Sequence, residues 1–405
     1  MKDATKAVIA GRDPHANFGV VNPPVYRAST ILSPTLADRR ASRAIAPGDG
    51  VTYGIHGTPG TFAFEEAVRA LEGGFRTRLC ASGLTAVTAP LLCCTKAGDH
   101  VLMPDAVYAP SRTFADGMLA RMGVTTTYYD PLIGGGIEAL LRPNTSVVLV
   151  ESPCTWTFEV QDVPAIADAA HRAGAIVMMD NTWASPLYFK AFEHGVDISI
   201  QAATKYIAGH SDLLMGTVTA NEATYPLIQK GWQELGLCAG PDDVYLAMRG
   251  IRTIATRLKQ QEESGLRVAH WLAGREEVAH VMHPAMEHDP GHALWKRDFL
   301  GASSLFGFIL REDLSQEPAL AALLDGLALY GMGSSWGGYE SLLIPVEPER
   351  QRTVTAWPRE GIPRGQVMRI HIGLEDTDDL IADLEAGFDR LRQSRVASNC
   401  SGTPI

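Results

Sequence analysis

An acidic residue and a lysine each follow an apolar, strand-like run near the middle of the chain. Asp180 ends the run 175–179, and Lys205 comes shortly after the run 197–201 and before a polar turn at 209–212. A strand-end carboxylate with a strand-end lysine is what a pyridoxal phosphate (PLP) site requires, because the lysine amine bonds to the cofactor aldehyde and the carboxylate keeps the pyridine nitrogen protonated. The pair therefore predicts an enzyme whose chemistry starts at the α-carbon of an amino acid.

Both residues also have an ordinary alternative role. Lys205 can be a solvated surface lysine, and Asp180 can simply cap the turn that begins at Asn181. The alternative for Asp180 weakens when it is considered together with Lys205. If Lys205 lies in a desolvated place beside another cation, its pKa falls, and the neutral amine then serves as both nucleophile and base.

A short polar stretch at 82–85 lies between a strand-like and a helix-like segment. The amide groups at a helix N-terminus bind phosphate, and Gly83 lets the backbone approach closely. The hydroxyl of Thr204, next to the lysine, is a candidate donor to the same phosphate. The alternative is a Ser/Gly turn that only caps the helix.

Two more side chains suit an aromatic cofactor and an amino-acid substrate. Tyr108 follows the strand-like run 101–103, where its ring can stack on the cofactor. The alternative is a half-buried tyrosine with no such role. Arg369 lies inside an apolar run, where arginine is rare unless it is paired. Its planar fork fits a substrate α-carboxylate, with a structural salt bridge as the alternative.

The elements that must position these residues alternate between helix and strand from about residue 61. The strand-like runs are continuously apolar, which predicts an α/β fold with a mostly parallel sheet covered by helices on both faces. Ligands bind at the carboxyl ends of such strands, where Glu151, Asp180 and the residues around Lys205 fall. Apolar runs at 304–310 and 367–372, followed by an amphipathic helix, predict a smaller C-terminal α+β domain.

Composition limits the class of protein. The chain has 405 residues, of which 46% are hydrophobic and 20% charged, as in an ordinary globular protein. Its formal net charge of −11 disfavours nucleic acid and anionic membranes as partners. There is no signal-like N-terminal segment and no apolar run near the ~20 residues of a membrane span. The six cysteines are too few for a disulfide scaffold, so we expect them to be reduced and the protein to be cytoplasmic.

Four histidines lie close together in a proline-containing segment. They are His280, His283, His288 and His292. Their spacing matches no common zinc pattern, and no cysteine accompanies them. We therefore expect no metal site and interpret the segment as an exposed loop.

Long runs of the sequence resemble the Cys/Met-metabolism family of PLP enzymes, and within it those members that cleave cystathionine at the β-carbon. The matching runs cover almost the whole chain: 98–103, 163–166, 180–184, 199–206, 209–212, 295–299, 335–341 and 369–376. The resemblance implies a fold-type I PLP enzyme with an N-terminal arm (1–60), a PLP-binding domain (61–255) and a smaller C-terminal domain (256–405). It also implies a homotetramer of two dimers whose active sites are shared between subunits.

The resemblance assigns roles residue by residue. It implies that Lys205 is the Schiff-base lysine, Asp180 the pyridinium partner and Tyr108 the stacking residue. The remaining expected site residues are Gly83, Leu84, Thr204 and Tyr53 for the phosphate, and Ser335, Trp336 and Arg369 for the substrate. Tyr53 would reach the site of a partner subunit.

The sequence departs from the family in the arm. Where the family has a phosphate-binding arginine two residues after the arm tyrosine, this chain has Ile55, followed by His56. Isoleucine cannot pair with phosphate, so our hypothesis is that His56 partly replaces the arginine. Retention of PLP would then be weaker.

The implied activity is β-elimination from cystathionine or a related cysteine S-conjugate, giving a thiol, pyruvate and ammonia. Lys205 would remove the α-proton, and Lys205 or Tyr108 would help the thiolate leave. Two alternatives stay open at this point. One is γ-elimination or γ-replacement on a homocysteine-type substrate, and the other is a family-fold binding protein without catalysis.

Overall fold

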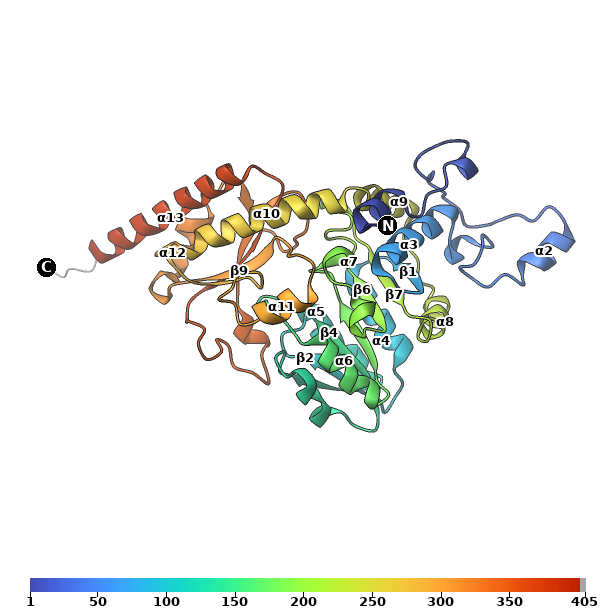
Figure 1. The fold of residues 1–405 in the computed structure, drawn as a ribbon, viewed down its shortest axis with the longest axis horizontal. Coiled ribbons are helices and arrows are strands. Elements are labelled where there is room, and N and C mark those ends of the chain that lie inside the picture. Colours follow the sequence, from blue (N-terminus) through green and yellow to red (C-terminus); the bar gives the residue numbers. More distant parts are fainter. Residues whose placement is uncertain (401–405) are drawn as a thin grey trace.

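The computed structural model describes the backbone of residues 1–400 and the side chains of residues 1–394. Within these residues the chain forms a seven-stranded sheet and a five-stranded sheet, each with its own covering helices (Figure 1). The helix α10 (Ile254–Ala273) runs from the first region to the second.

The seven-stranded sheet is mostly parallel, as the sequence predicts. Its strands are β1 (Arg76–Cys80), β2 (His100–Pro104), β3 (Thr125–Tyr129), β4 (Thr145–Glu151), β5 (Ile176–Asp180), β6 (Ile198–Gln201) and β7 (Gly216–Ala220). Their order is β1-β7-β6-β5-β4-β2-β3. Strands β2 to β6 are parallel to one another, whereas β7 is antiparallel to both β6 and β1.

Helices cover both faces of this sheet, which explains why its central strands are apolar throughout. The helices of this region are α3 (Pro59–Glu72), α4 (Gly83–Cys94), α5 (Ala109–Phe114), α6 (Val163–Arg172), α7 (Ser185–Tyr188), α8 (Tyr225–Leu235) and α9 (Pro241–Ile251). In β4, Val147 and Leu149 pack in the core formed with α4 and α8, while Val148 and Val150 pack in the core formed with α6. Burial on both faces removes the alternation seen in a half-exposed strand.

The five-stranded sheet forms a second core. Its strands are β8 (Val278–Met282), β9 (Leu305–Leu310), β10 (Tyr330–Gly331), β11 (Ser341–Val346) and β12 (Val367–His371), and three helices on it are α10, α12 (Glu317–Leu324) and α13 (Thr377–Cys400). The strand order is β10-β11-β12-β9-β8. The last helix is amphipathic as expected, since Leu380, Leu384, Phe388 and Leu391 are all fully buried. The short helix α11 (His292–Asp298) follows β8.

The first sixty residues build little core. They contain α1 (Asp3–Ile9) and α2 (Leu36–Ser42), and the loops around α2 extend away from the rest of the chain (Figure 1). Ala7 is the one buried hydrophobic residue among them, whereas Phe18, Leu32 and Leu36 are exposed. The structure thus agrees with the interpretation of this segment as one that cannot form a core alone.

Candidate active site

Asp180 and Lys205 lie at the carboxyl ends of adjacent parallel strands. Asp180 is the last residue of β5, and Lys205 lies four residues after the end of β6. Thr182 links the two ends, because its amide (3.1 Å) and hydroxyl (2.5 Å) donate to Asp180 Oδ1 while its oxygen accepts from the Ala202 amide (2.9 Å). Asp180 Oδ2 receives no hydrogen bond from any residue that the structure describes, so one carboxylate oxygen is left for a ligand.

The Lys205 amine faces a turn from the second region of the molecule. Its Nζ donates to Ser335 Oγ at 2.6 Å and lies 5.2 Å from the centroid of the Trp336 ring. Gly337 allows this approach, because it has a φ of +82° and a Cβ there would lie 3.0 Å from the Lys205 backbone. Burial and, after it, the Arg369 charge lower the pKa of Lys205 from 10.5 to about 8, while the Asp180 charge opposes both.

Arg369 lies in the middle of β12 and is 7% exposed. Its guanidinium donates to the backbone carbonyls of Gly333 (2.9 Å), Ser334 (3.0 Å) and Ser335 (2.9 Å). No carboxylate among the described residues forms an ion pair with it, so a structural salt bridge is not its role there. Burial lowers the pKa of Arg369 to about 10, which indicates a cation that an added carboxylate would stabilise.

Tyr108 stands just before α5, and 43% of its surface is exposed. Its backbone amide donates to Glu151 Oε2 at 2.8 Å. Burial raises the pKa of its phenol, as do the charges of Asp180 and Glu151, whereas Arg369 lowers it. The phenol is therefore protonated at neutral pH and lies within electrostatic range of the groups described above.

The N-terminus of α4 faces the end of β6. Ser82 caps the helix by accepting from the Thr85 amide at 3.1 Å. A Cβ on Gly83 would lie 2.5 Å from the Ala202 side chain, so the close approach requires glycine. The amides of Gly83 and Leu84 donate to no acceptor in the described part of the chain, as expected in a first helical turn.

The other predicted phosphate ligands lie in different surroundings. Thr204 Oγ1 donates to the Met215 carbonyl (3.2 Å) and accepts from the Met215 amide (3.0 Å). Tyr53 is 47% exposed in the arm. His56 Nδ1 lies 3.0 Å from Thr52 Oγ1, and the His56 ring lines a cavity of about 80 Å³. No contact joins Tyr53 or His56 to Lys205 within the described residues, so their roles stay predictions.

The interpretation of the histidine segment as an exposed loop holds for the exposed His288 but is wrong for the start of the segment. His280 lies on β8, and His283 is fully buried against Phe306, with 5.2 Å between ring centroids. Burial lowers the pKa of His283 to about 3, so it packs as a neutral aromatic residue. Within the described residues, no group of three or more His, Cys, Asp or Glu could hold a metal ion.

Two positioning residues were missed from the sequence. Thr182 holds Asp180 and the end of β6 together, and its place two residues after the acid was the available signal. His371 is fully buried and accepts from the Gly337 amide at 3.2 Å, which fixes the turn against Lys205. Its partner lies 34 residues away, so no local pattern indicates it.

These residues fit a bound PLP. The Asp180 oxygen that receives no hydrogen bond matches a pyridinium nitrogen, and the two free amides at the N-terminus of α4 match a phosphate. The desolvated Lys205 amine matches the cofactor aldehyde, and the Arg369 guanidinium, which has no carboxylate partner, matches a substrate carboxylate.

Comparisons with known proteins agree with this class of site. The profile of the family described as Cys/Met metabolism PLP-dependent enzyme matches residues 4–389, and the chain belongs to this family. It is 49% identical over 386 residues to a putative cystathionine β-lyase of Rhizobium johnstonii, covering 95% of each chain. It is 44% identical over 391 residues to the cystathionine β-lyase MetC of Escherichia coli, covering 96% of this chain and 98% of that one.

The fold is shared with solved structures of the family. One is the cystathionine γ-synthase of Xanthomonas oryzae pv. oryzae in complex with aminoacrylate and cysteine, with a TM-score of 0.87 and 29% identity. The match covers 97% of this chain and 99% of that one. The fold is therefore the fold-type I PLP-enzyme fold that the sequence predicts. None of the described helices is long and apolar enough to cross a membrane.

Proposed function

We propose that this chain is a PLP-dependent carbon–sulfur lyase that acts by β-elimination on cystathionine or a related cysteine S-conjugate. The products are a thiol (homocysteine from cystathionine), pyruvate and ammonia. The observation that carries the proposal is the grouping of Asp180 and the Lys205 amine, at the carboxyl ends of β5 and β6, with Ser335 and Arg369 from the second region. Arg369 has no carboxylate partner among the described residues. The high identity to proteins named cystathionine β-lyase supports elimination at the β-carbon.

Each chain residue has a defined task in this reaction. Arg369 holds the substrate α-carboxylate, assisted by Ser335, and Trp336 closes the side of the site next to the lysine. When bound, PLP supplies the electron sink for the charge left at the α-carbon. Lys205 removes the α-proton, and its lowered pKa places a useful fraction of the neutral amine near physiological pH.

The remaining residues hold the cofactor and assist the leaving group. With PLP bound, Asp180 would hold the pyridine nitrogen, and the amides of Gly83 and Leu84 with the Thr204 hydroxyl would hold the phosphate. Tyr108 would stack against the ring. Its protonated phenol, or the protonated Lys205, donates to the thiolate as the bond from Cβ to sulfur breaks.

The arrangement of subunits belongs to the same proposal. We infer a cytoplasmic homotetramer of two dimers that serves methionine biosynthesis, with arm (1–60), PLP-binding domain (61–255) and C-terminal domain (256–405) as divided from the sequence. The exposed apolar side chains of the arm support it, because Phe18, Leu32 and Tyr53 are more than 40% exposed in the single chain. A second subunit would cover them and receive Tyr53.

Keto-acid analysis tests the reaction. With cystathionine as substrate we expect pyruvate and homocysteine. 2-Oxobutyrate as the main product would instead indicate γ-elimination. A protein that stays colourless with added PLP would favour a binding protein without catalysis. Borohydride reduction followed by peptide mapping should place the cofactor on Lys205, and a label elsewhere would contradict the assignment.

A further inference from the structure

Glu151 is a buried acid at the same sheet edge whose role no sequence pattern settles. It is the last residue of β4, and its Cα partner on β5 is Asp180. In parallel strands such partners project toward the same face. Glu151 is 6% exposed, so its carboxyl group lies inside the protein beside that of Asp180.

The Glu151 carboxyl group is held by two segments of the site. Its Oε2 accepts from the Tyr108 amide at 2.8 Å, and its Oε1 accepts from the Thr155 amide at 2.8 Å. The Thr155 hydroxyl lies 2.5 Å from Oε1. Glu151 therefore fixes the start of the loop that carries Tyr108.

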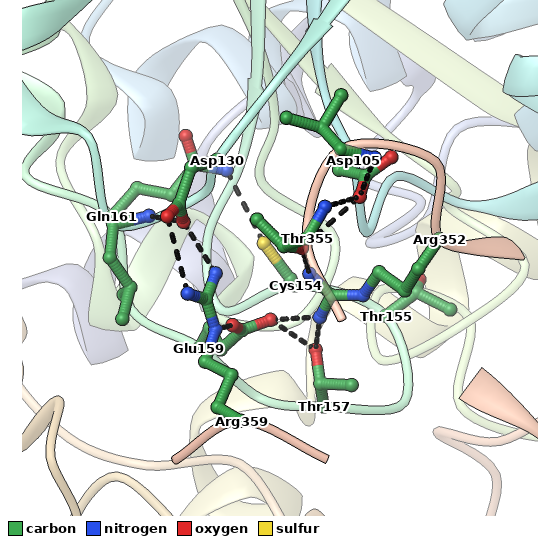
Figure 2. A network of polar contacts seen from close by, with 12 residues as sticks. Asp105, Asp130, Cys154, Thr155, Thr157, Glu159, Gln161, Arg352, Thr355 and Arg359 are labelled. Atoms are coloured by element: carbon green, nitrogen blue, oxygen red, sulfur yellow. Dashed lines mark hydrogen bonds and ion pairs between the residues drawn. The ribbon is translucent and has the colours of Figure 1, made fainter. Parts of the chain in front are cut away.

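The segment that follows Glu151 is itself rigidly anchored. Gln161 donates to the Glu151 carbonyl at 2.8 Å, and Glu159 is bound by the guanidinium groups of Arg352 and Arg359 (Figure 2). These contacts hold the backbone around Thr155 against the large sheet. The position of the Glu151 carboxyl group is thus set by the fold before any ligand binds.

The electrostatic surroundings of Glu151 favour its neutral form. The titratable groups that face it are Asp180, Tyr108, Cys154 and Tyr129, none of which is a cation. Burial and, after it, the Asp180 charge raise the pKa of Glu151 from 4.5 to about 8, against the lowering effect of the hydrogen bonds from Thr155 and Tyr108. Burial raises the pKa of Asp180 as well, but two hydrogen bonds from Thr182 and the Lys205 charge oppose that rise. Glu151 has no cation partner within the described residues.

We propose that Glu151 is a positioning residue of this active site, which holds the Tyr108 loop through the Tyr108 amide and carries a proton, so that the negative charge at the strand ends stays on Asp180. Asp180 then remains ionised for the pyridine nitrogen.

Three variants separate this role from a purely structural one. Glu151→Gln keeps a neutral polar group of the same shape, whose amide oxygen can accept from the Tyr108 amide. Glu151→Ala removes the contacts with Tyr108 and Thr155. Glu72→Gln is the matched control, because Glu72 is buried, accepts from Ser199 and Gln201, and has a pKa raised to about 7 by burial, yet makes no contact with Tyr108.

The first readout is the cofactor, and it rests on the proposed function. We expect Glu151→Ala to weaken PLP binding and kcat/KM by roughly tenfold or more, since the Tyr108 amide loses its acceptor. Glu151→Gln should stay within about threefold of wild type and leave the pH midpoint of the bound cofactor's visible absorption unchanged. Wild-type behaviour of Glu151→Ala, or a midpoint lowered by about one unit in Glu151→Gln, would overturn the proposal.

The second readout is the stability of the apoprotein, which does not depend on PLP. Because the folded protein holds the Glu151 proton up to about pH 8 and the unfolded chain releases it near 4.5, stability from this group falls as pH rises between those values. Glu151→Gln should flatten the profile over that window. An unchanged profile contradicts the proton on Glu151, even if wild type took up no PLP and the proposed function failed.

Discussion

Two buried carboxyl groups follow neighbouring strands of the large sheet and have opposite acidities. Asp105 comes directly after β2 and Glu151 ends β4, and both are at most 6% exposed. Burial raises the pKa of both groups. In Asp105, hydrogen bonds from the residue 353–355 segment outweigh burial and lower the pKa from 3.8 to about 2. In Glu151, burial and the Asp180 charge prevail and the pKa rises to about 8.

The number of donors accounts for the difference. Asp105 accepts from the amides of Thr353, Val354 and Thr355 and from two hydroxyl groups of the same segment (Figure 2). Arg112 also donates to Asp105. Glu151 has donors from two residues and no cation among its described neighbours. A carboxylate that accepts its full number of hydrogen bonds stabilises the fold, and here Asp105 holds the 353–355 segment against the large sheet. A buried carboxyl group with fewer donors, such as Glu151, keeps a raised pKa, which is typical of a functional site.

Substitution of Lys205 should give the largest effect of all, and it should change activity without changing stability. We expect Lys205→Ala to lower the rate of pyruvate formation by at least about 10³-fold, because the base is lost. Thermal unfolding should be unchanged, since Lys205 forms no ion pair in the described structure.

Lys190 provides the matched control for that experiment. Its amine donates to the carbonyls of Leu71 and Pro186 and pairs with Asp3. Lys190→Ala should therefore reduce stability while leaving chemistry at the site intact. Substantial turnover by Lys205→Ala would contradict the assigned base.

Substitution of Asp105 should give the largest loss of stability. Asp105→Ala leaves the Arg112 guanidinium and three backbone amides without their acceptor, so we expect the free energy of unfolding to fall by about 3 kcal/mol or more. Denaturant titration measures this. The exposed Asp168 on α6 is the control, and its change to alanine should stay within about 0.5 kcal/mol. Equal losses of stability in both variants would contradict the role of Asp105 in holding the 353–355 segment.

The two carboxyl groups should also differ in their dependence on pH. The folded-state pKa of Asp105 lies below its unfolded value, so its contribution is present above about pH 3.8 and is lost as pH falls through about 2. The stability gap between wild type and Asp105→Asn should accordingly be full at pH 7 and close in acid. Unfolding measured from pH 7 down to pH 2 tests this, and a gap that persists at the lowest pH would speak against an ionised Asp105.

Substitution of the two arginines that bind Glu159 should lower the stability by different amounts. Arg352 is 3% exposed and Arg359 is 21% exposed in their side chains, so water replaces the lost contact more readily at Arg359. We expect Arg352→Ala to cost about 2–3 kcal/mol of stability and Arg359→Ala about 1 kcal/mol. Double-mutant cycles with Glu159→Gln would isolate each pair. A larger coupling for Arg359 would reverse our ranking.

The strand ends could be predicted from sequence because they depend on local patterns. Continuous apolar runs located β5 and β6, and hence Asp180 and Lys205, within a residue or two. The pairing of Glu151 with Asp180 could not be predicted, since it depends on the register between two strands. The partners of Asp105 lie 248 to 250 residues further along the chain, where no local signal relates the two segments.

One local irregularity could not be predicted. The helix that begins as α5 continues through a π-helical turn at Ala115–Leu119. An extra residue inserted in a turn leaves the hydrophobic pattern almost unchanged, so periodicity cannot detect it. The helix directly follows Tyr108, which places this irregularity near the candidate site.

The smallest expected effect is on PLP release and comes from the N-terminal arm, which contains neither Asp105 nor Glu151. If His56 partly replaces an arginine at the phosphate, His56→Ala should speed PLP release by about two- to fivefold, the size of an exposed ion pair. Ile55→Arg should slow release below that of wild type, because a guanidinium binds phosphate in a bidentate way. Release followed by transfer of PLP to an acceptor apoenzyme measures both. Unchanged release in His56→Ala would remove this histidine from the phosphate site, and the response of Ile55→Arg would still show whether position 55 faces it.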